Sequence, residues 1–127
     1  MEIAVTQGVE VSVESFFVQQ DSEPEQERYT FAYRVRLKNL GEEPVQLISR
    51  HWIITDSTGR VSHVKGEGVV GEQPRLAPGE EYEYMSGSHL ESPVGTMEGT
   101  YQMRLDRGQM FDVEIPRFTL AVPGKIN

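Results

Sequence analysis

The sequence predicts an all-β protein, an antiparallel β-sandwich of the immunoglobulin or fibronectin type III-like kind. Three observations carry this prediction. Apolar and polar residues alternate with the two-residue period of half-buried strands in several short stretches. Turn-forming residues separate those stretches at regular intervals. No stretch longer than about ten residues has helical spacing without a glycine or proline inside it. Roughly eight or nine short strands arranged in this way are typical of one sandwich domain.

The composition describes an ordinary folded chain. Hydrophobic residues make up 37% of the 127 positions and charged residues 25%, as in globular domains. The absence of cysteine excludes disulfides and thiolate chemistry and favours a cytoplasmic location. The net charge of −8 repels phosphate backbones, so we expect no nucleic-acid partner. No apolar run approaches the roughly 20 residues that cross a bilayer, and no signal peptide is visible, so we expect no membrane association.

The first half of the chain contains three predicted strands. Val9 to Phe17 alternates valines with polar residues, and Tyr29 to Asn39 shows the clearest alternation of all. Between them, the acidic stretch Gln19 to Arg28 contains a proline and predicts a mobile loop. Val45 to Asp56 is a longer apolar run that holds the only tryptophan, Trp52. A tryptophan buried in the middle of a strand is typical of immunoglobulin-like sandwiches.

The second half predicts shorter strands joined by glycine turns. Asp56 to Gly59 has the residues of a type I turn, and Ala77 to Glu80 those of a type II turn. Tyr101 is placed like the tyrosine of a tyrosine corner, with its hydroxyl bonded to upstream backbone. Pro116 is expected to stop a strand. The strands predicted here cover Arg60 to Lys65, Tyr82 to Ser88, Gly99 to Asp106, Met110 to Ile115 and Phe118 to Val122.

The stretch Val64 to Leu76 is the one segment whose pattern suggests a ligand. It has three glycines at the G-x-G-x-x-G spacing, namely Gly66, Gly68 and Gly71. A dinucleotide fingerprint needs a helix directly afterwards to hold the pyrophosphate. Pro78 and Gly79 would end such a helix within a turn, and no G-K-[ST] motif is present. The pattern therefore favours a glycine-bent connection between strands, in which glycines supply positive φ angles and close backbone approach.

An anion site at the loop 66–71 remains the alternative interpretation. Successive glycine amides can form a nest for an anion, and Lys65 and Arg75 flank the loop with positive charge. The ligand would be a phosphate, a pyrophosphate or a metal–phosphate complex. Gly66, Gly68, Gly71, Lys65 and Arg75 are thus the candidate ligand-binding residues.

The histidines and serines predict no catalytic or metal site. His51 and His63 lie about equally far from the Asp56–Gly59 turn, so they are expected to face each other across a hairpin. We interpret them, with His89, as polar positions on strands, although a metal set completed by a carboxylate stays open. No serine lies in a nucleophile motif, so we expect no enzyme and no cofactor. An enzyme acting on phosphate esters would need a base near the glycine loop, where only His63 or Glu67 is close.

Several linked motifs, in order along nearly the whole chain, resemble the bacterial ApaG family. They are H-W-I-I-T-D-S-T-G (His51 to Gly59), V-K-G-E-G-V-V-G-E-Q-P-R-L-A-P-G (Val64 to Gly79), Y-x-Y-x-S-G (Tyr82 to Gly87), G-T-M-E-G-T-Y (Gly95 to Tyr101) and I-P-x-F-x-L (Ile115 to Leu120). The resemblance implies a single ApaG domain over residues 3–127 with a fibronectin type III-like fold.

The resemblance also carries functional expectations. The family is associated with cobalt resistance and magnesium efflux, without an established biochemical activity or family-wide catalytic residues to transfer. In eukaryotes the same domain occurs fused to other proteins, where it resembles a protein-recognition module. We therefore expect a non-enzymatic binding module that recognises a protein partner, through an edge strand or through the surface around the glycine loop. The sequence does not identify this partner.

Overall fold

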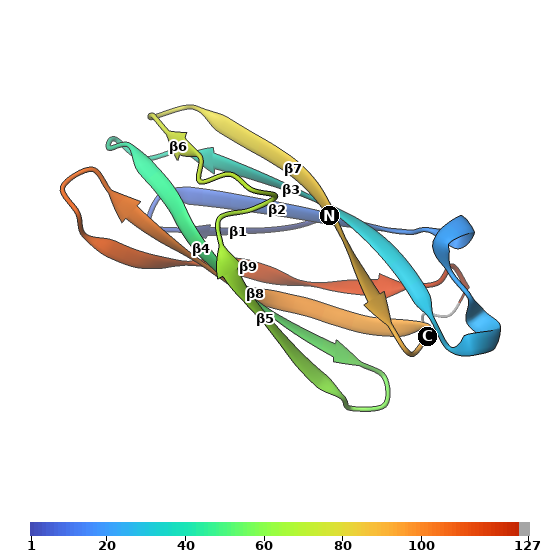
Figure 1. The fold of residues 1–127 in the computed structure, drawn as a ribbon. Helices are drawn as coiled ribbons and strands as arrows, with labels where there is room; N and C mark the ends of the chain where they lie inside the picture. Colours follow the sequence, from blue (N-terminus) through green and yellow to red (C-terminus); the bar gives the residue numbers. More distant parts are fainter. Residues whose placement is uncertain (125–127) are drawn as a thin grey trace.

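The computed structural model describes residues 1–124, which form nine β-strands and two 3-10 turns (Figure 1). The strands are β1 (Glu2–Thr6), β2 (Val9–Phe17), β3 (Tyr29–Asn39), β4 (Val45–Asp56), β5 (Val61–Glu67), β6 (Arg75–Leu76), β7 (Glu81–Leu90), β8 (Val94–Leu105) and β9 (Met110–Ala121). The 3-10 turns are η1 (Gln19–Asp21) and η2 (Pro24–Gln26). No helix within this described part of the chain is long and apolar enough to span a membrane.

The strands form two antiparallel sheets, which confirms the predicted β-sandwich. One sheet has the order β1-β2-β3-β7. The other has the order β5-β4-β8-β9, with the short β6 paired to the start of β4. Figure 1 shows the two layers face to face, with the β4–β5 hairpin extending away from the sheet that contains β7.

The core lies between the sheets and follows the alternation read from the sequence. Val9, Val11 and Val13 of β2 are at most 1% exposed. Trp52 of β4 is also buried, as predicted. The rings of Tyr33, Tyr101 and Phe118 surround its indole at centroid distances of 5.3, 6.3 and 5.9 Å in edge-to-face arrangements. Such aromatic contacts add to the free energy of burial, so this cluster joins the two sheets at their centre.

The tyrosine-corner prediction is wrong. Tyr101 points into the core, where its hydroxyl forms a hydrogen bond with the hydroxyl of Tyr84 from the opposite sheet. Burial raises the pKa of both phenols, for Tyr101 well above the ordinary value. Because both hydroxyls stay protonated, they can satisfy each other in an environment where unpaired polar groups are costly.

The bounds of several other strands differ from the predictions, and β8 begins at Val94 instead of Gly99. β1 and β6 were not predicted, and β7 continues to Leu90. β9 runs through Pro116 instead of stopping there. The register between β8 and β9 shifts between Met97 and Gly99 opposite this proline, and β9 is an outer strand of its sheet. A bulge at a sheet edge tolerates a residue that cannot donate a ladder hydrogen bond.

The expected mobile loop is instead tied by specific hydrogen bonds. Ser22 accepts a hydrogen bond from the amide of Thr30 at 2.9 Å, and the Thr30 hydroxyl donates to the carbonyl of Asp21 at 2.8 Å. The turn η1 ends at Asp21, one of these anchors, and η2 lies between Ser22 and the start of β3. The segment is therefore a structured end cap beside the groove described below.

The two long sides of the sandwich are built differently. On one side, β9 lies against β1 and β2: Thr6 accepts a hydrogen bond from the Glu114 amide at 3.1 Å, and the Ser15 hydroxyl donates to the Thr119 carbonyl at 2.7 Å. We call this the closed side. The outer strands on the opposite side are β5 and β7, and no ladder joins them. We call this the open side, and the candidate functional residues lie there.

Candidate functional site

The β4–β5 hairpin is held by the turn that the sequence predicted. Gly59 has a φ of +90°. The Asp56 carboxylate accepts hydrogen bonds from the Thr58 amide, the Thr58 hydroxyl and the Arg60 amide. These bonds lower the pKa of Asp56, the Thr58 contact first among them. The turn fixes the register, so that Trp52 of β4 lies opposite Val64 of β5.

β5 is an exposed outer strand with one unpaired edge. In the described part of the chain it pairs with β4 alone. All of its residues are exposed except Gly66, which is half-buried. Val61 and Val64 are 52% and 42% exposed. Because β5 extends beyond the cover of the opposite sheet, its apolar side chains meet solvent on both faces.

The amides on the unpaired edge can be assigned from the ladder. The Asp56 amide donates to the Arg60 carbonyl at 3.0 Å. In an antiparallel pair, residues that bond to the partner alternate with residues that do not. Positions 62, 64 and 66 therefore bond to β4, and the amides of positions 61, 63, 65 and 67 point away from it. These four positions present the strand edge that another chain would meet.

The glycine motif forms a tight reversal after β5. Gly68 and Gly71 have φ angles of +61° and +82°, and Val70 between them is also left-handed. Val69 and Glu72 exchange both backbone hydrogen bonds, at 2.8 and 2.9 Å. This is the pattern of a two-residue hairpin turn with positive φ at both central positions. A glycine-bent β-connection, the favoured interpretation of the motif, is what the structure contains.

The three glycines of the motif are needed for different structural reasons. A Cβ on Gly68 would lie 2.2 Å from the Glu72 carbonyl oxygen, whereas one on Gly71 would meet open space. Gly66 has extended backbone, but a Cβ there would lie 2.8 Å from a guanidinium nitrogen of Arg50. Gly66 is thus small to make room for Arg50, and only Gly68 and Gly71 supply positive φ.

Arg50 is the charged residue that sequence reasoning missed. Its guanidinium donates to the carbonyls of Glu67 and Gly68 at 3.1 and 2.8 Å. The amides of Gly68, Val69 and Glu72 are themselves bonded to backbone carbonyls. The loop therefore directs carbonyls toward a cation of the chain, and three of its amides are already used. An arginine within the apolar run of β4 was the one sequence signal for this contact.

The two predicted flanking cations have separate environments. Arg75 faces Asp106 at the β8–β9 turn, with 3.0 Å between its Nε and the Asp106 Oδ1. This contact raises the pKa of Arg75 and lowers that of Asp106. Lys65 lies opposite His51 in the β4–β5 register and forms no ion pair with the described residues. Lys65 is thus on the outer face of the hairpin with His51, Arg50 is on the inner face against Gly66, and Arg75 is engaged by Asp106.

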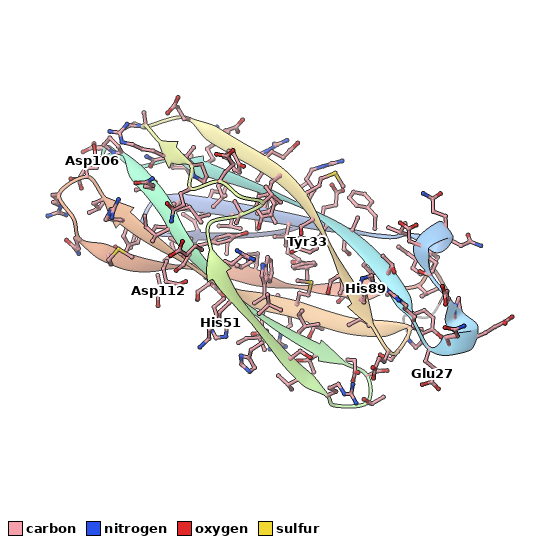
Figure 2. All side chains as sticks on the ribbon, viewed as in Figure 1. Glu27, Tyr33, His51, His89, Asp106 and Asp112 are labelled. Carbon is pink, nitrogen blue, oxygen red and sulfur yellow. The ribbon has the colours of Figure 1, made fainter. Side chains whose placement is uncertain are left out.

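His51 and His63 do face each other across the hairpin, as predicted. The Nε2 of His51 lies 2.9 Å from the Nδ1 of His63. The pKa of His51 is lowered by desolvation and then by the charges of Lys65 and His63. Figure 2 shows His51 pointing away from the sandwich core. His89 is on β7, where its Nδ1 lies 3.0 Å from the Thr30 hydroxyl.

A groove of about 480 Å³ separates β5 from the end of β7 on the open side. Its floor includes Ile54 and Leu90, and Ser62 of β5 contributes to one wall. Arg60 and Glu91 bridge its rim with an ion pair of 2.7 Å. The 3-10 turn region closes its far end, with Glu27 beside it (Figure 2). The groove continues the exposed edge of β5 and provides space for side chains of a segment lying along it.

The fold and this edge define the class of the protein: a small antiparallel β-sandwich whose outer strand β5 has an unpaired edge beside a groove. The family profile described as "ApaG domain" matches residues 19–105. The Protein ApaG of Aromatoleum aromaticum is 56% identical over 115 residues, covering 91% of each chain. The Protein ApaG of Sodalis glossinidius is 54% identical over 117 residues, covering 92% of this chain and 94% of that one.

Solved structures agree with the sequence relatives. The crystal structure of the putative ApaA protein from Bordetella pertussis superposes with a TM-score of 0.89 at 52% identity. The superposition covers 92% of this chain and 95% of that one. The chain therefore belongs to the ApaG family.

Proposed function

We propose that the protein is a non-enzymatic binding module that recognises a protein partner by strand addition at the β5 edge. The observation that carries the proposal is the unpaired, exposed edge of β5 with its two exposed valines. An added strand gains affinity from main-chain hydrogen bonds and specificity from alternate side chains. The groove between β5 and β7 gives those side chains a place to bind.

The other outer strands are less suited to this role. β9 lies against β1 and β2 on the closed side. On β7, Glu81 and Glu83 form ion pairs with neighbouring β3 side chains. Charged side chains on an outer strand discourage the addition of another strand. β5 also carries the charged residues Lys65 and Glu67, but its unpaired edge lies beside the groove and has two exposed valines, so it is the favoured place for strand addition.

The charges favour an acidic partner segment. Most basic side chains of the described residues are paired with carboxylates: Arg34, Arg36, Lys38, Arg60, Arg75, Arg107 and Arg117. Lys65 has no such partner, and Arg50 is bonded to carbonyls. In a chain of net charge −8, Lys65 thus gives the β5 edge one positive charge without a carboxylate partner among the described residues. An extended segment with acidic side chains complements that edge.

Site-specific photo-crosslinking in cells tests the proposal. A crosslinking amino acid at position 64 is compared with one at position 85, because Met85 is an exposed apolar residue on β7. We expect a discrete adduct from position 64 alone. The substitution Val61→Pro removes an outward amide at the start of β5 and should abolish the adduct. Equal adducts from both positions, or an adduct unaffected by Val61→Pro, would contradict strand addition.

An anion site at the loop 66–71 is the second candidate, supported by the charge of Lys65, which directly precedes the loop and forms no ion pair with the described residues. Its ligand would be phosphate, pyrophosphate or a metal–phosphate complex. The use of three loop amides within the backbone weighs against it. Titration with pyrophosphate, with and without Mg²⁺, separates the candidates: shifts at residues 66–71 that vanish in Lys65→Gln support the anion site. The links to cobalt resistance, magnesium efflux and the cytoplasm stay predictions from the resemblance and composition.

A further inference from the structure

A second feature of the β4–β5 hairpin is the pair of imidazoles on its outer face, on the side away from the groove. His51 and His63 occupy diagonal positions on adjacent strands, since His51 is opposite Lys65 and Ile53 is opposite His63. Their facing nitrogens are 2.9 Å apart, and the ring centroids are 5.1 Å apart. We propose that His51 Nε2 and His63 Nδ1 form a two-imidazole chelating site for a late first-row divalent cation such as Ni²⁺, Cu²⁺ or Zn²⁺.

The separation of the two nitrogens matches a chelating pair. Imidazole nitrogen binds such ions at about 2.0–2.1 Å. Two ligands at neighbouring corners of an octahedron or square then lie about 2.9 Å apart, since these geometries have right angles between adjacent ligands. In the tetrahedral geometry of Zn²⁺ they lie about 3.3 Å apart, so the separation favours Ni²⁺ or Cu²⁺. The hydrogen-bonded rings already place both nitrogens at the separation that these two ions require. The rings need only turn so that both lone pairs point at one ion.

The hydrogen bond between the rings does not prevent this. At present one neutral imidazole donates its N–H to the other ring. A change of tautomer moves that proton to the second nitrogen of the donor ring and frees both facing lone pairs. No proton leaves the neutral pair, so the cation competes only with one hydrogen bond. Both rings lie on a surface that solvent ions reach.

The surrounding charges tune the site. Lys65 of β5 lies opposite His51 in the β4–β5 register, and its positive charge opposes the binding of a cation at the pair. Glu98 of β8 and Glu114 of β9 line the shallow groove beside His51. Glu98 is paired with Arg117 at 2.8 Å. No cluster of three or more potential ligands occurs in the described residues, so water or a carboxylate from another molecule would occupy the remaining positions.

The ligand set selects the ion. Imidazole suits Ni²⁺, Cu²⁺ and Zn²⁺, whereas Mg²⁺ prefers oxygen ligands in a nearly complete octahedron. The site uses the side chains of the outer face, whereas strand addition uses the β5 backbone edge, including the His63 amide, and the groove on the inner face of the hairpin. Each proposal can fail without the other.

Titration with NiCl₂ of the isotopically labelled chain, followed by NMR and calorimetry, tests the site. We expect one equivalent of Ni²⁺ to broaden the resonances around His51 and His63 first. His51→Ala and His63→Ala should each weaken binding by about tenfold or more, because one imidazole replaces two. His89→Ala is the matched control and should bind like the unmodified chain, and MgCl₂ should cause no broadening at the hairpin.

Two further variants distinguish the metal site from the anion site and from strand addition. Lys65→Gln should tighten Ni²⁺ binding, since it removes a nearby positive charge, whereas it would weaken an anion at the glycine turn. Val61→Pro should abolish partner crosslinking and leave Ni²⁺ binding intact. The metal site is overturned if His63→Ala binds Ni²⁺ as tightly as the unmodified chain, or if broadening begins at His89 or at the amino terminus.

Discussion

The closed and open sides of the sandwich shield the same hydrophobic core from solvent by different means. On the closed side, single side chains of β1 and β2 reach the backbone of β9. On the open side, the segment after β5 fills part of the space between the sheets with Val69 and Leu76, which are both buried. The remainder is a groove beside an unpaired strand. A small sandwich can therefore leave one edge available for binding because a connecting segment, and not a further strand, seals the core there.

A pair of residues opposite each other in the β4–β5 register shows where the buried core ends on the open side. Trp52 and Val64 are register partners and their side chains point to the same face. Trp52 is 2% exposed, however, and Val64 is 42% exposed. The boundary between the core and the candidate binding edge therefore lies between the adjacent strands β4 and β5.

The largest expected effect comes from substituting this pair. Trp52→Ala should lower the free energy of unfolding by about 3–5 kcal/mol, because it leaves a large cavity among aromatic rings of both sheets. Val64→Ala should change it by less than about 0.5 kcal/mol, since the side chain meets solvent. Urea unfolding followed by circular dichroism measures both. Comparable losses for the two variants would show that the core extends beneath β5.

The next largest loss of stability is expected from the glycines of the turn that follows β5 on the open side. Gly68→Ala combines a left-handed φ with a clash against the Glu72 carbonyl, whereas Gly71→Ala suffers only the unfavourable φ. Gly71→Ala should cost about 1–2 kcal/mol of stability, and Gly68→Ala about 1–3 kcal/mol more. Hydrogen exchange of the Val69 and Glu72 amides should accelerate most in Gly68→Ala. Equal effects would mean that the turn relaxes freely.

A smaller effect is expected on the closed side. Thr6→Val removes the acceptor for the Glu114 amide while keeping a β-branched side chain. It should lower the free energy of unfolding by about 1 kcal/mol, the usual contribution of one hydrogen bond. Val61→Thr on the open side is the matched control and should be nearly neutral. A neutral Thr6→Val would indicate that solvent replaces the bond and that β1 is not needed for closure.

The smallest effect is a pH dependence of the β4–β5 turn. Because the folded-state pKa of Asp56 is lowered, its contribution is present above its ordinary pKa of 3.8 and is lost as the pH falls through the folded-state value. Exchange of the Thr58 and Arg60 amides should therefore accelerate, relative to the intrinsic rate, below about pH 4. In Asp56→Asn this acceleration should be absent. If the variant retains it, another carboxyl group controls the turn.

Local patterns predicted most of this fold. Alternation located β2 and β3, a longer apolar run located β4, and glycine positions located the turns at Gly59 and Gly79. Ala77 and Glu80 are bonded across the predicted type II turn. These features depend on neighbouring residues, so they are readable in one sequence.

What the sequence did not predict depends on distant residues. The continuation of β9 through Pro116 requires a register shift in β8. The role of Gly66 follows from Arg50, which lies in the preceding strand and bonds to carbonyls 17 and 18 positions away. For the candidate site, the facing histidines were predicted from their distances to the turn, but the pairing of Arg75 with Asp106 was not. Spacing reveals hairpin neighbours and does not reveal contacts made by the tertiary fold.

The single tryptophan gives the protein a built-in optical reporter. Trp52 is the only indole in the chain, and its Nε1 is buried without a hydrogen-bond partner in the described residues. Its fluorescence should therefore report an apolar environment and shift to longer wavelength only when the sheets separate. A ligand added along the β5 edge would leave the emission wavelength unchanged. The same cuvette measurement can thus distinguish occupation of the outer edge from loosening of the interior.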